Sequence, residues 1–397
     1  MLPLLFMKRQ CLLLLNSRSN SVTIMKIAVI RQKYVNYGGA EQFVSEYTTH
    51  LAEAGHEIHI FAHQWTPSVH PNIRIHPVRA FTLNSFFRTL SFAWFAARAV
   101  RRESFDIVQS HERTWCQDVY RAGDGCHREW LERRSNYLSP LKKWSFRFNW
   151  FHQLILKLEK HIFESGQCKK IIAISEMVKR DILKHYCLPA EKVEVVYNGV
   201  RLDRFHPDNK RRYRNKVRER IGVPGDVVMI LFVGSGFERK GLEYLVRAVG
   251  LLGCENWRLV LVGKGDWSRY LRFASEQTRE KIIALDPVDD VETLYAAADL
   301  FVLPSIYEPF GNANLEALAS GLPIVTSRNT GVAEIIEPKK EGMIVEDPSN
   351  PKAIAEAIVY LMDPKVRELM GKFARSLAER FTQKRNAEAM LRIYRAL

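Results

Sequence analysis

The sequence predicts an α/β protein in which two doubly wound, Rossmann-like domains face each other across a cleft. A chain of 397 residues exceeds the usual size of one hydrophobic core, so two domains of roughly 150 to 200 residues are expected. In both halves, short apolar runs of strand length alternate with helical stretches, which is typical of βαβ units around a parallel sheet. Ligands of such sheets bind outside the carboxyl ends of the strands.

Residues 1–24 precede this pattern. Two short apolar runs, 2–6 and 12–15, are separated by polar and basic residues, and neither run is long enough to span a bilayer. Met25 directly precedes the first convincing strand. We therefore interpret residues 1–24 as a non-structural extension.

The first domain is expected over residues 25–200. Its opening strand, glycine loop, helix and second strand make one βαβ unit. The expected elements are strands at 26–30, 58–62, 105–109, 170–174 and 193–196, a loop at 36–40, and helices at 41–53 and 86–102.

The second domain is expected over residues 201–380, and a helix over 381–397 is expected to cross back and pack toward the first domain. Phe205-His-Pro207 and the basic stretch 209–220 break the alternation, and we interpret them as the interdomain connection. The later expected elements are strands at 227–233, 257–262, 300–303 and 323–326, helices at 241–252, 291–298, 314–320 and 351–362, and a helical tail at 365–397.

The charge balance is unusual for an otherwise ordinary globular composition. Hydrophobic residues make up 47% of the chain and charged residues 26%, which indicates neither disorder nor a membrane bundle. With 59 Lys and Arg against 44 Asp and Glu, the net charge is +15. This excess favours an anionic partner: a nucleotide, a phosphorylated glycan, a nucleic acid or an acidic membrane. The six cysteines lack metal-binding spacing and are interpreted as reduced thiols of a cytoplasmic protein.

The loop at 234–241 is a candidate phosphate-binding loop. Gly234 and Ser235 follow a strand, and Arg239 and Lys240 precede a helix. Glycines let the backbone approach a phosphate closely, and a helix start offers unpaired N–H groups. The loop has neither P-loop nor dinucleotide-binding spacing, so a plain turn with a solvated lysine is the alternative.

The segment 304–323 carries a more specific signal. Glu308 lies on the loop after the strand at 300–303, and Glu316 lies in the first turns of the next helix. Carboxylates accept hydrogen bonds from sugar hydroxyls, and N–H groups at a helix start bind phosphates. Between the two glutamates lie three further donor-binding candidates, Phe310, Gly311 and Asn312.

Together these motifs make residues 26–381 resemble glycosyltransferase family four, whose members adopt the GT-B fold and retain the anomeric configuration of the sugar. The shared motifs are Gly38-Gly-Ala-Glu41, Asn198-Gly-Val200, Val233-Gly234, Lys240-Gly241, Val262-Gly-Lys-Gly265, Leu294-Tyr-Ala-Ala-Ala-Asp-Leu300 and the pair Glu308 and Glu316. The resemblance implies that Lys240 binds the donor diphosphate, Glu308 the sugar hydroxyls and Glu316 the ribose.

One position departs from the family pattern. The family usually has Arg where this chain has Ser235, so Arg239 is expected to supply the second positive charge. Together with Asp118-Val-Tyr-Arg-Ala-Gly-Asp124, this variant resembles the lipopolysaccharide core glucosyltransferases, which add the first outer-core glucose to heptose. The resemblance implies UDP-glucose as donor and a lipopolysaccharide-core or other lipid-linked glycan as acceptor.

The expected chemistry needs no metal cofactor. No D-x-D motif occurs in the chain, so the common carboxylate arrangement for Mg²⁺ on a sugar diphosphate is missing. Negative charge grows on the leaving β-phosphate as the glycosidic bond breaks, and Lys240 and Arg239 can stabilise it. With Glu308 they are the catalytic candidates. The resemblance implies front-face attack by the acceptor hydroxyl, whose proton passes to the departing phosphate.

The first domain supplies five further candidates. Gly38 and Gly39 can bring backbone N–H groups to a phosphate or sugar, and many family members have a donor-contacting histidine at a strand end, as at His111. Asp118 and Asp124 are candidates for orienting the acceptor. Each candidate also has a structural alternative. The two glycines can form a simple tight turn, the histidine can be a packed residue, and the two aspartates can be capping or solvated carboxylates.

Residues 128–160 mix basic and aromatic side chains, a composition that suits an interfacial helix on anionic lipid. Part of the segment also has the three-four apolar spacing of a core-facing helix. We interpret it, together with the helix at 86–102, as a docking surface for the inner face of the cytoplasmic membrane. The expected location is therefore cytoplasmic and peripheral to that membrane.

Two other functions are alternatives. Only the net charge supports a nucleic-acid-binding protein, and because no nucleic-acid module is recognisable, no nucleic-acid partner is expected. A different cell-envelope polysaccharide glycosyltransferase is the alternative within the same fold, since one fold hosts many functions.

Overall fold

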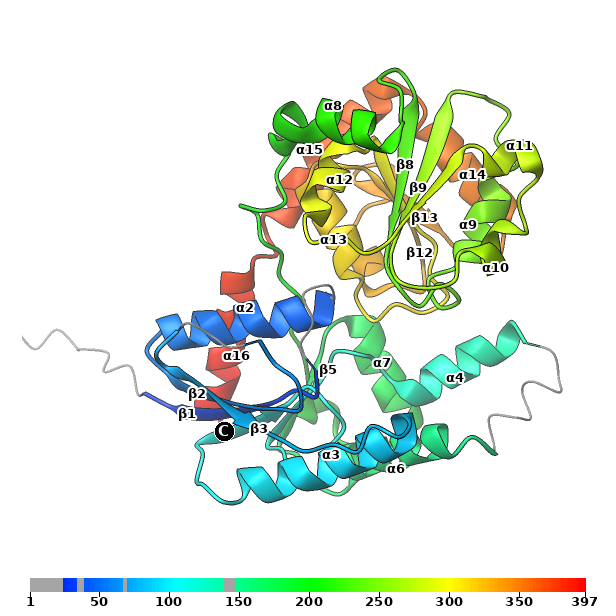
Figure 1. Cartoon of the computed structure of the whole chain (residues 1–397). Coiled ribbons are helices and arrows are strands. Elements are labelled where there is room, and N and C mark those ends of the chain that lie inside the picture. Colours follow the sequence, from blue (N-terminus) through cyan, green and yellow to red (C-terminus); the bar gives the residue numbers. More distant parts are fainter. Residues whose placement is uncertain (1–23, 34–38, 67–69, 139–147) are drawn as a thin grey trace, which may run out of the picture.

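The computed structural model describes residues 24–33, 39–66, 70–138 and 148–397 and consists of two lobes, each built on one parallel sheet (Figure 1). Most of residues 1–24, Gly38 and part of the segment 128–160 lie outside the described residues. The fold is the GT-B arrangement expected from the resemblance: two Rossmann-like domains and a C-terminal helix that returns to the first.

The N-terminal sheet has seven strands in the order β3-β2-β1-β4-β5-β6-β7. Strand β1 pairs with a neighbour on each side: Ile27 lies opposite Ile58 of β2 and opposite Ile107 of β4. The strands are β1 (Lys26–Ile30), β2 (Glu57–Ala62), β3 (Ile73–Pro77), β4 (Ile107–Ser110), β5 (Val119–Ala122), β6 (Lys170–Ala173) and β7 (Val193–Val195). The described helices of this lobe are α2 (Gly39–Glu53), α3 (Ser85–Val100), α4 (His127–Asn136), α6 (Trp150–Glu164) and α7 (Glu176–His185).

The C-terminal sheet has six strands in the order β10-β9-β8-β11-β12-β13. Its strands are β8 (Val228–Val233), β9 (Trp257–Val262), β10 (Ile282–Leu285), β11 (Leu300–Leu303), β12 (Ile324–Ser327) and β13 (Gly342–Val345). Its helices are α8 (Asn209–Ile221), α9 (Leu242–Val249), α10 (Ser268–Leu271), α11 (Glu276–Arg279), α12 (Val291–Ala297), α13 (Asn312–Ala319), α14 (Pro351–Tyr360) and α15 (Pro364–Ala378). Helices cover both faces of each sheet (Figure 1), which explains why the central strands are apolar throughout.

The last helix, α16 (Gln383–Arg395), packs on the N-terminal lobe (Figure 1). The two chain segments that cross between the lobes are hydrogen-bonded together, because Val200 N donates to Phe381 O at 2.9 Å and Gln383 Nε2 to Gly199 O at 2.9 Å. Met390 and Tyr394 of α16 join the core of the first lobe. The lobe that carries the first sheet is therefore completed by the end of the chain.

The structure differs from the sequence prediction at several elements. The basic stretch 209–220, interpreted as a connection, is helix α8, whose Arg214 and Arg218 bind the Asp299 carboxylate at 2.8 and 2.5 Å. The predicted tail is two helices, with Thr382 capping the second at Arg385 N. Strands β3, β5, β10 and β13 were not predicted.

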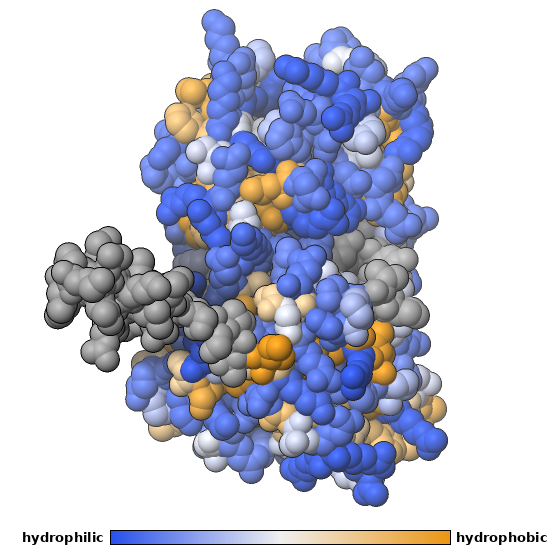
Figure 2. All heavy atoms as spheres, turned by 90° about the vertical axis from the view of Figure 1, so that its left-hand side faces the viewer, coloured by the Kyte–Doolittle hydropathy of each residue, from blue (hydrophilic) through white to orange (hydrophobic). Residues whose placement is uncertain are grey.

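No helix in the described ranges combines the length and the apolar character that crossing a membrane requires. The side of the molecule seen in Figure 2 is mostly hydrophilic, with small hydrophobic areas separated by polar side chains.

Shortening a buried side chain of α16 should destabilise the protein. Met390 is 0% exposed, so Met390→Ala should lower the free energy of unfolding by about 2 to 5 kcal/mol through lost burial and a cavity. Leu369→Ala is the control, because Leu369 is 57% exposed and its truncation should change the value by less than about 0.5 kcal/mol. Equal effects of both changes in urea unfolding would show that α16 does not belong to the core.

Candidate functional site

A cavity of about 950 Å³ lies between the two lobes and is lined by residues from both. Its lining residues follow the carboxyl ends of strands in each sheet, where ligands of doubly wound sheets bind. They include Arg31 after β1, His111 after β4, Ile174 after β6, Gly234 after β8 and Gly263 after β9. The cleft expected from the sequence is this cavity.

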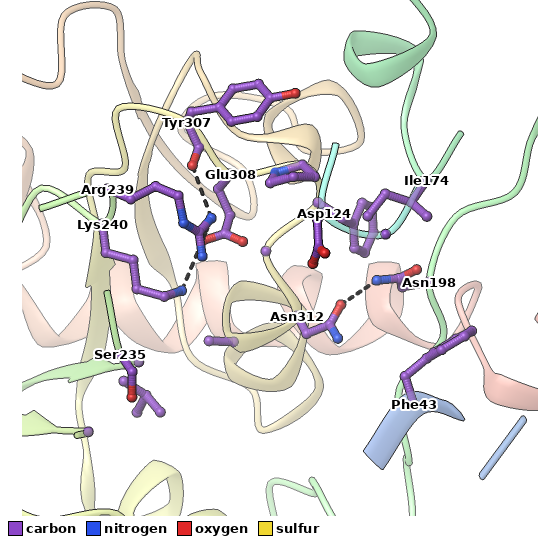
Figure 3. A pocket seen from close by; sticks show the side chains of 18 of the residues that line it. Phe43, Asp124, Ile174, Asn198, Ser235, Arg239, Lys240, Tyr307, Glu308 and Asn312 are labelled. Atoms are coloured by element: carbon purple, nitrogen blue, oxygen red, sulfur yellow. Dashed lines mark hydrogen bonds and ion pairs between the residues drawn. The ribbon is translucent and has the colours of Figure 1, made fainter. Parts of the chain in front are cut away.

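Three predicted catalytic residues form one ion cluster in the cavity wall (Figure 3). Lys240 Nζ lies 2.9 Å and Arg239 Nη1 3.0 Å from the same oxygen, Glu308 Oε2. Lys240 and Glu308 are 8% and 9% exposed, so little water screens the interaction. We call this group the ion cluster.

The two cations determine the charge state of Glu308. Burial alone would raise the pKa of its carboxyl group, but the charges of Arg239 and Lys240 outweigh burial and lower the pKa to about 2. For Lys240, burial is the stronger influence and lowers the pKa of its amine despite the nearby carboxylate. Glu308 is consequently ionised at neutral pH and has no proton to donate.

Gly234 makes room for the Lys240 side chain. Its φ of +146° lies in a region that favours glycine, and a Cβ added there would lie 2.4 Å from Lys240 Cε. The loop backbone therefore runs directly against the aliphatic part of the lysine. Ser235 connects this loop to the next one, since its Oγ accepts a hydrogen bond from Lys264 N at 3.0 Å.

Helix α13 begins at the ion cluster. Gly311, with φ +94°, is its N-cap residue, and Asn312 is its first residue. The four first N–H groups of a helix lack partners within the helix, so its start favours an anion. Phe310, just before it, is buried and packs its ring against Tyr197 at 5.9 Å.

Glu316 lies one turn into α13 and also lines the cavity. Tyr295 Oη donates to Glu316 Oε2 at 2.9 Å, which fixes the carboxylate against the helix. Burial raises the pKa of Glu316. Glu308 and Glu316 thus differ in environment: one is bound by two cations and the other by a tyrosine.

His111 is a packed, neutral histidine in the cavity wall. It is 6% exposed and its ring lies 6.5 Å from that of Phe43 and 6.1 Å from that of Tyr47. Burial, followed by the charge of Arg121, lowers the pKa of His111 well below its usual value. His111 packs against its neighbours and also lines the cavity. The packing alternative is therefore compatible with the predicted place of His111 at the donor site.

Of the two predicted acceptor residues, Asp124 lies at the cavity and Asp118 does not. Asp124 lines the cavity and lies near Glu308 and Asn312 (Figure 3). Asp118 precedes β5 and does not line the cavity; its carboxylate binds Lys169 Nζ at 3.0 Å and accepts from Val108 N at 2.9 Å. The prediction for Asp118 was wrong because it lies at the amino end of β5, the opposite end of the sheet.

Gly39 is the first residue of α2, and Gly38 lies outside the described residues. The structure also adds cavity residues that the sequence did not single out. Among them are Arg31, Arg113, Arg121, His127, Trp130, Asn198 and Tyr307. Arg121 and Asn198 lie within motifs of the family resemblance, and Tyr307 directly precedes Glu308. Only this proximity to a motif could have indicated these cavity residues from the sequence.

Two groups of side chains in the described residues have ligand atoms close enough together for a metal ion, and neither lines the cavity. One is His59, His76 and Glu103; the other is Glu129, Glu132 and His185. In the second, Lys184 Nζ already lies 2.9 Å from both glutamates. On its C-terminal side the cavity offers the cations of the ion cluster, the start of α13 and the carboxylates of Glu308 and Glu316, a set that suits a sugar diphosphate.

Comparisons with known proteins agree with the fold. A family model described as Glycosyltransferase Family 4 matches residues 37–204, and one described as Glycosyl transferases group 1 matches residues 228–364. The chain is 39% identical over 198 residues to an uncharacterized glycosyltransferase of Methanocaldococcus jannaschii, and the match covers 49% of this chain and 50% of that protein.

A second relative matches over most of both chains. It is the lipopolysaccharide glucosyltransferase WaaG of Escherichia coli, 25% identical over 341 residues, covering 84% of this chain and 88% of the relative. The crystal structure of a WaaG glycosyltransferase superposes with a TM-score of 0.80 at 23% identity, over 93% of this chain and 99% of that one. Anabaena HepE, solved with UDP and glucose, shares the fold with a TM-score of 0.71 at 17% identity, covering 94% and 100%.

Removing the shared carboxylate of the ion cluster should destabilise the protein in a pH-dependent way. Glu308→Gln leaves two cations without their buried partner, which should cost about 3 to 5 kcal/mol at pH 7. The pKa of Glu308 is lowered from 4.5 to about 2, so its contribution is complete above pH 4.5 and is lost as the pH falls toward 2. The difference from wild type in urea unfolding should therefore shrink between pH 5 and pH 3.

Glu346→Gln is the matched control, because Glu346 is 72% exposed in its pair with Arg328. That change should cost at most about 1 kcal/mol. A Glu308→Gln deficit that does not change with pH would contradict the account of the ion cluster.

Proposed function

The chain belongs to glycosyltransferase family four and has the GT-B fold, and we propose that it transfers a hexose, glucose from UDP-glucose, to a hydroxyl of a lipopolysaccharide-core or other lipid-linked glycan. The observation that carries the proposal is the ion cluster in the wall of a cavity shared by both lobes. The reaction retains the anomeric configuration and uses no metal ion.

The donor lies with its diphosphate between the ion cluster and the start of α13. Lys240 and Arg239 bind the phosphate oxygens, for which a guanidinium and an ammonium are both suited. Glu308 then shares its cations with the diphosphate and accepts hydrogen bonds from sugar hydroxyls. Glu316, fixed by Tyr295 at 2.9 Å, accepts from the ribose.

The transfer step depends on stabilising the leaving group. The bond between the sugar C1 and the β-phosphate oxygen breaks as the acceptor hydroxyl oxygen bonds to C1 from the same face. The hydroxyl proton passes to the departing phosphate oxygen, so atoms and charge balance without an enzyme nucleophile. Lys240, Arg239 and the N–H groups at the start of α13 stabilise the negative charge that develops on the phosphate.

The acceptor enters from the N-terminal lobe. Asp124 faces the ion cluster from that lobe (Figure 3), where a carboxylate can orient the attacking hydroxyl. The E. coli relative is named a lipopolysaccharide glucosyltransferase, and the structure of HepE holds UDP and glucose. The ligands of HepE support a UDP-linked glucose donor, and the name of the E. coli relative supports glucose transfer to a cell-envelope acceptor.

A basic, aromatic surface on the N-terminal lobe supports docking on anionic lipid. Helices α3 and α6 pack against each other at the end of this lobe that is remote from the C-terminal domain (Figure 1). Trp94 is 53% and Trp150 78% exposed, and Arg98 lies 5.9 Å from the ring of Trp94. Exposed aromatic rings beside basic side chains favour an anionic interface. The surface supports the proposed location at the inner face of the cytoplasmic membrane, beside a lipid-linked acceptor.

The donor prediction is tested by slow hydrolysis without acceptor. Among UDP, GDP and ADP sugars, UDP-glucose should be bound and hydrolysed. Lys240→Ala should lower kcat for this hydrolysis by about 10²-fold or more, because the leaving phosphate loses a charge partner.

Lys372→Ala, which removes a lysine with a 70% exposed side chain on α15, should leave kcat unchanged. Binding of none of these nucleotide sugars would contradict the proposed function. An unchanged kcat in Lys240→Ala would remove Lys240 from the mechanism.

Membrane docking is tested by liposome flotation. The wild-type chain should float with vesicles that contain anionic lipid and stay behind with neutral vesicles, because the charge of the surface drives binding. The double variant Trp94→Ala and Trp150→Ala should bind several-fold less.

Leu369→Ala, which truncates an exposed apolar residue on the other lobe, should float like wild type. Flotation that does not depend on anionic lipid would contradict the docking surface.

A further inference from the structure

One buried arginine in the cavity wall lacks a carboxylate partner. Among the described residues, three arginines are buried: Arg31, Arg121 and Arg218. Arg218 binds Asp299 at 2.5 Å and Arg31 binds Glu112 at 3.2 Å. Within the described part of the chain, Arg121 makes no such pair, although only 2% of it is exposed.

The surroundings of Arg121 are neutral. Its Nη2 donates to Asn198 Oδ1 at 2.6 Å, its guanidinium lies 4.1 Å from the ring centre of Phe43, and its buried Nε has no partner. The ionisable groups that influence it are Tyr47 and Tyr394, which are uncharged near pH 7. Burial lowers the pKa of Arg121 to about 10, so the side chain is still charged at neutral pH.

An arrangement of this kind is costly without a ligand. Removing a charge from water costs several kcal/mol, and the protein usually offsets the cost with an opposite charge and full hydrogen bonding. Here the cation stands in β5, whose other three residues, Val119, Tyr120 and Ala122, are all buried and uncharged. An apolar residue would suit that strand better unless the charge has a use.

Arg121 stands on the N-terminal lobe, whereas the two cations of the expected diphosphate site, Lys240 and Arg239, stand on the C-terminal lobe. Asn198 links it to the start of α13 by donating to Asn312 Oδ1 at 2.6 Å. Figure 3 shows Asn198 and Phe43 on one side of the cavity and the ion cluster on the other. Arg121 lines the same cavity, but from the N-terminal lobe.

We propose that Arg121 binds an anionic group, a carboxylate or a phosphate, that one of the two sugar substrates carries in addition to the donor diphosphate. The inference rests on the proposed function. Two sources carry this chemistry: an acidic substituent on the acceptor glycan, which is compatible with a glucose donor, and a C6 carboxylate on the transferred sugar, which would make that sugar a uronic acid in place of glucose. A guanidinium matches either oxyanion with two parallel hydrogen bonds, and Arg121 has donors left for them.

Binding measurements with defined probes distinguish the sources. Calorimetry gives Kd for UDP, UDP-glucose and UDP-glucuronic acid, and for inorganic phosphate added to the UDP-saturated protein. The proteins are wild type, Arg121→Gln, Arg121→Lys and Asn198→Ala, with Arg328→Gln as a control that removes a half-exposed charge outside the cavity lining.

Arg121→Gln should leave the Kd of UDP within about twofold of wild type and weaken one anionic probe about tenfold or more, as expected for a charged hydrogen bond. A change confined to UDP-glucuronic acid assigns the group to the transferred sugar, and a change in phosphate binding assigns it to the acceptor. Arg121→Lys keeps the charge and should retain much of the binding. Asn198→Ala removes the hydrogen-bond partner of Arg121 but keeps its charge, so this variant should also retain binding of the anionic probe. If Arg121 had only a structural role, the loss of this hydrogen bond should weaken binding as much as Arg121→Gln does.

The inference is overturned if Arg121→Gln affects neither probe, or if it weakens UDP as much as the anionic probes. If Arg121→Gln does not fold, the Kd values of the wild-type protein provide the test. The inference is overturned if wild type does not bind phosphate and does not bind UDP-glucuronic acid more tightly than UDP-glucose. Failure of wild type to bind UDP would instead contradict the proposed function itself.

Discussion

The site depends on one buried carboxylate, that of Glu308, which binds two cations at the carboxyl end of the C-terminal parallel sheet. Strands β8 and β11 are neighbours, with Leu300 opposite Ile230, so the loops that follow them meet. One loop brings Lys240 and Arg239, and the other brings Glu308. Because the three groups are assembled before any ligand arrives, little reorganisation is needed when a diphosphate binds, and preorganised charge is the main means by which such sites lower a barrier.

The N-terminal lobe forms the other wall of the site and holds the loop that carries Glu308. Ser175 Oγ donates to Pro309 O at 2.7 Å, and Tyr307 Oη donates to Asp181 Oδ2 at 3.0 Å, so the loop that carries Glu308 is fixed by the N-terminal lobe. Glu334 of the C-terminal lobe accepts hydrogen bonds at the start of α7, from Glu176 N at 2.6 Å. The cavity between the lobes therefore has a defined shape, and water is limited around the ion cluster, which strengthens its electrostatic effect.

Regular periodicity and motif spacing predicted the features that depend on local sequence. The apolar strands β1, β8 and β11 and the loop with Glu308 were all predicted near their observed positions. Strand β5 was missed because Arg121 interrupts a short apolar run, and a buried charge does not look like a strand in sequence. Asp118 was misplaced because proximity to a motif does not reveal at which end of a strand a residue lies. The basic helix α8 resembled a linker because its role is ionic, through Asp299 on a distant segment.

The central claim is that Lys240 and Arg239 bind the diphosphate of a nucleotide sugar. A crystal structure of the chain with UDP-glucose tests it most directly. The account predicts phosphate oxygens within about 3 Å of Lys240 Nζ and Arg239 Nη1, the start of α13 facing the same phosphates, and the glucose hydroxyls on Glu308. A nucleotide sugar bound elsewhere, or bound in the cavity with the Lys240–Glu308 pair intact and no phosphate near either cation, would contradict it.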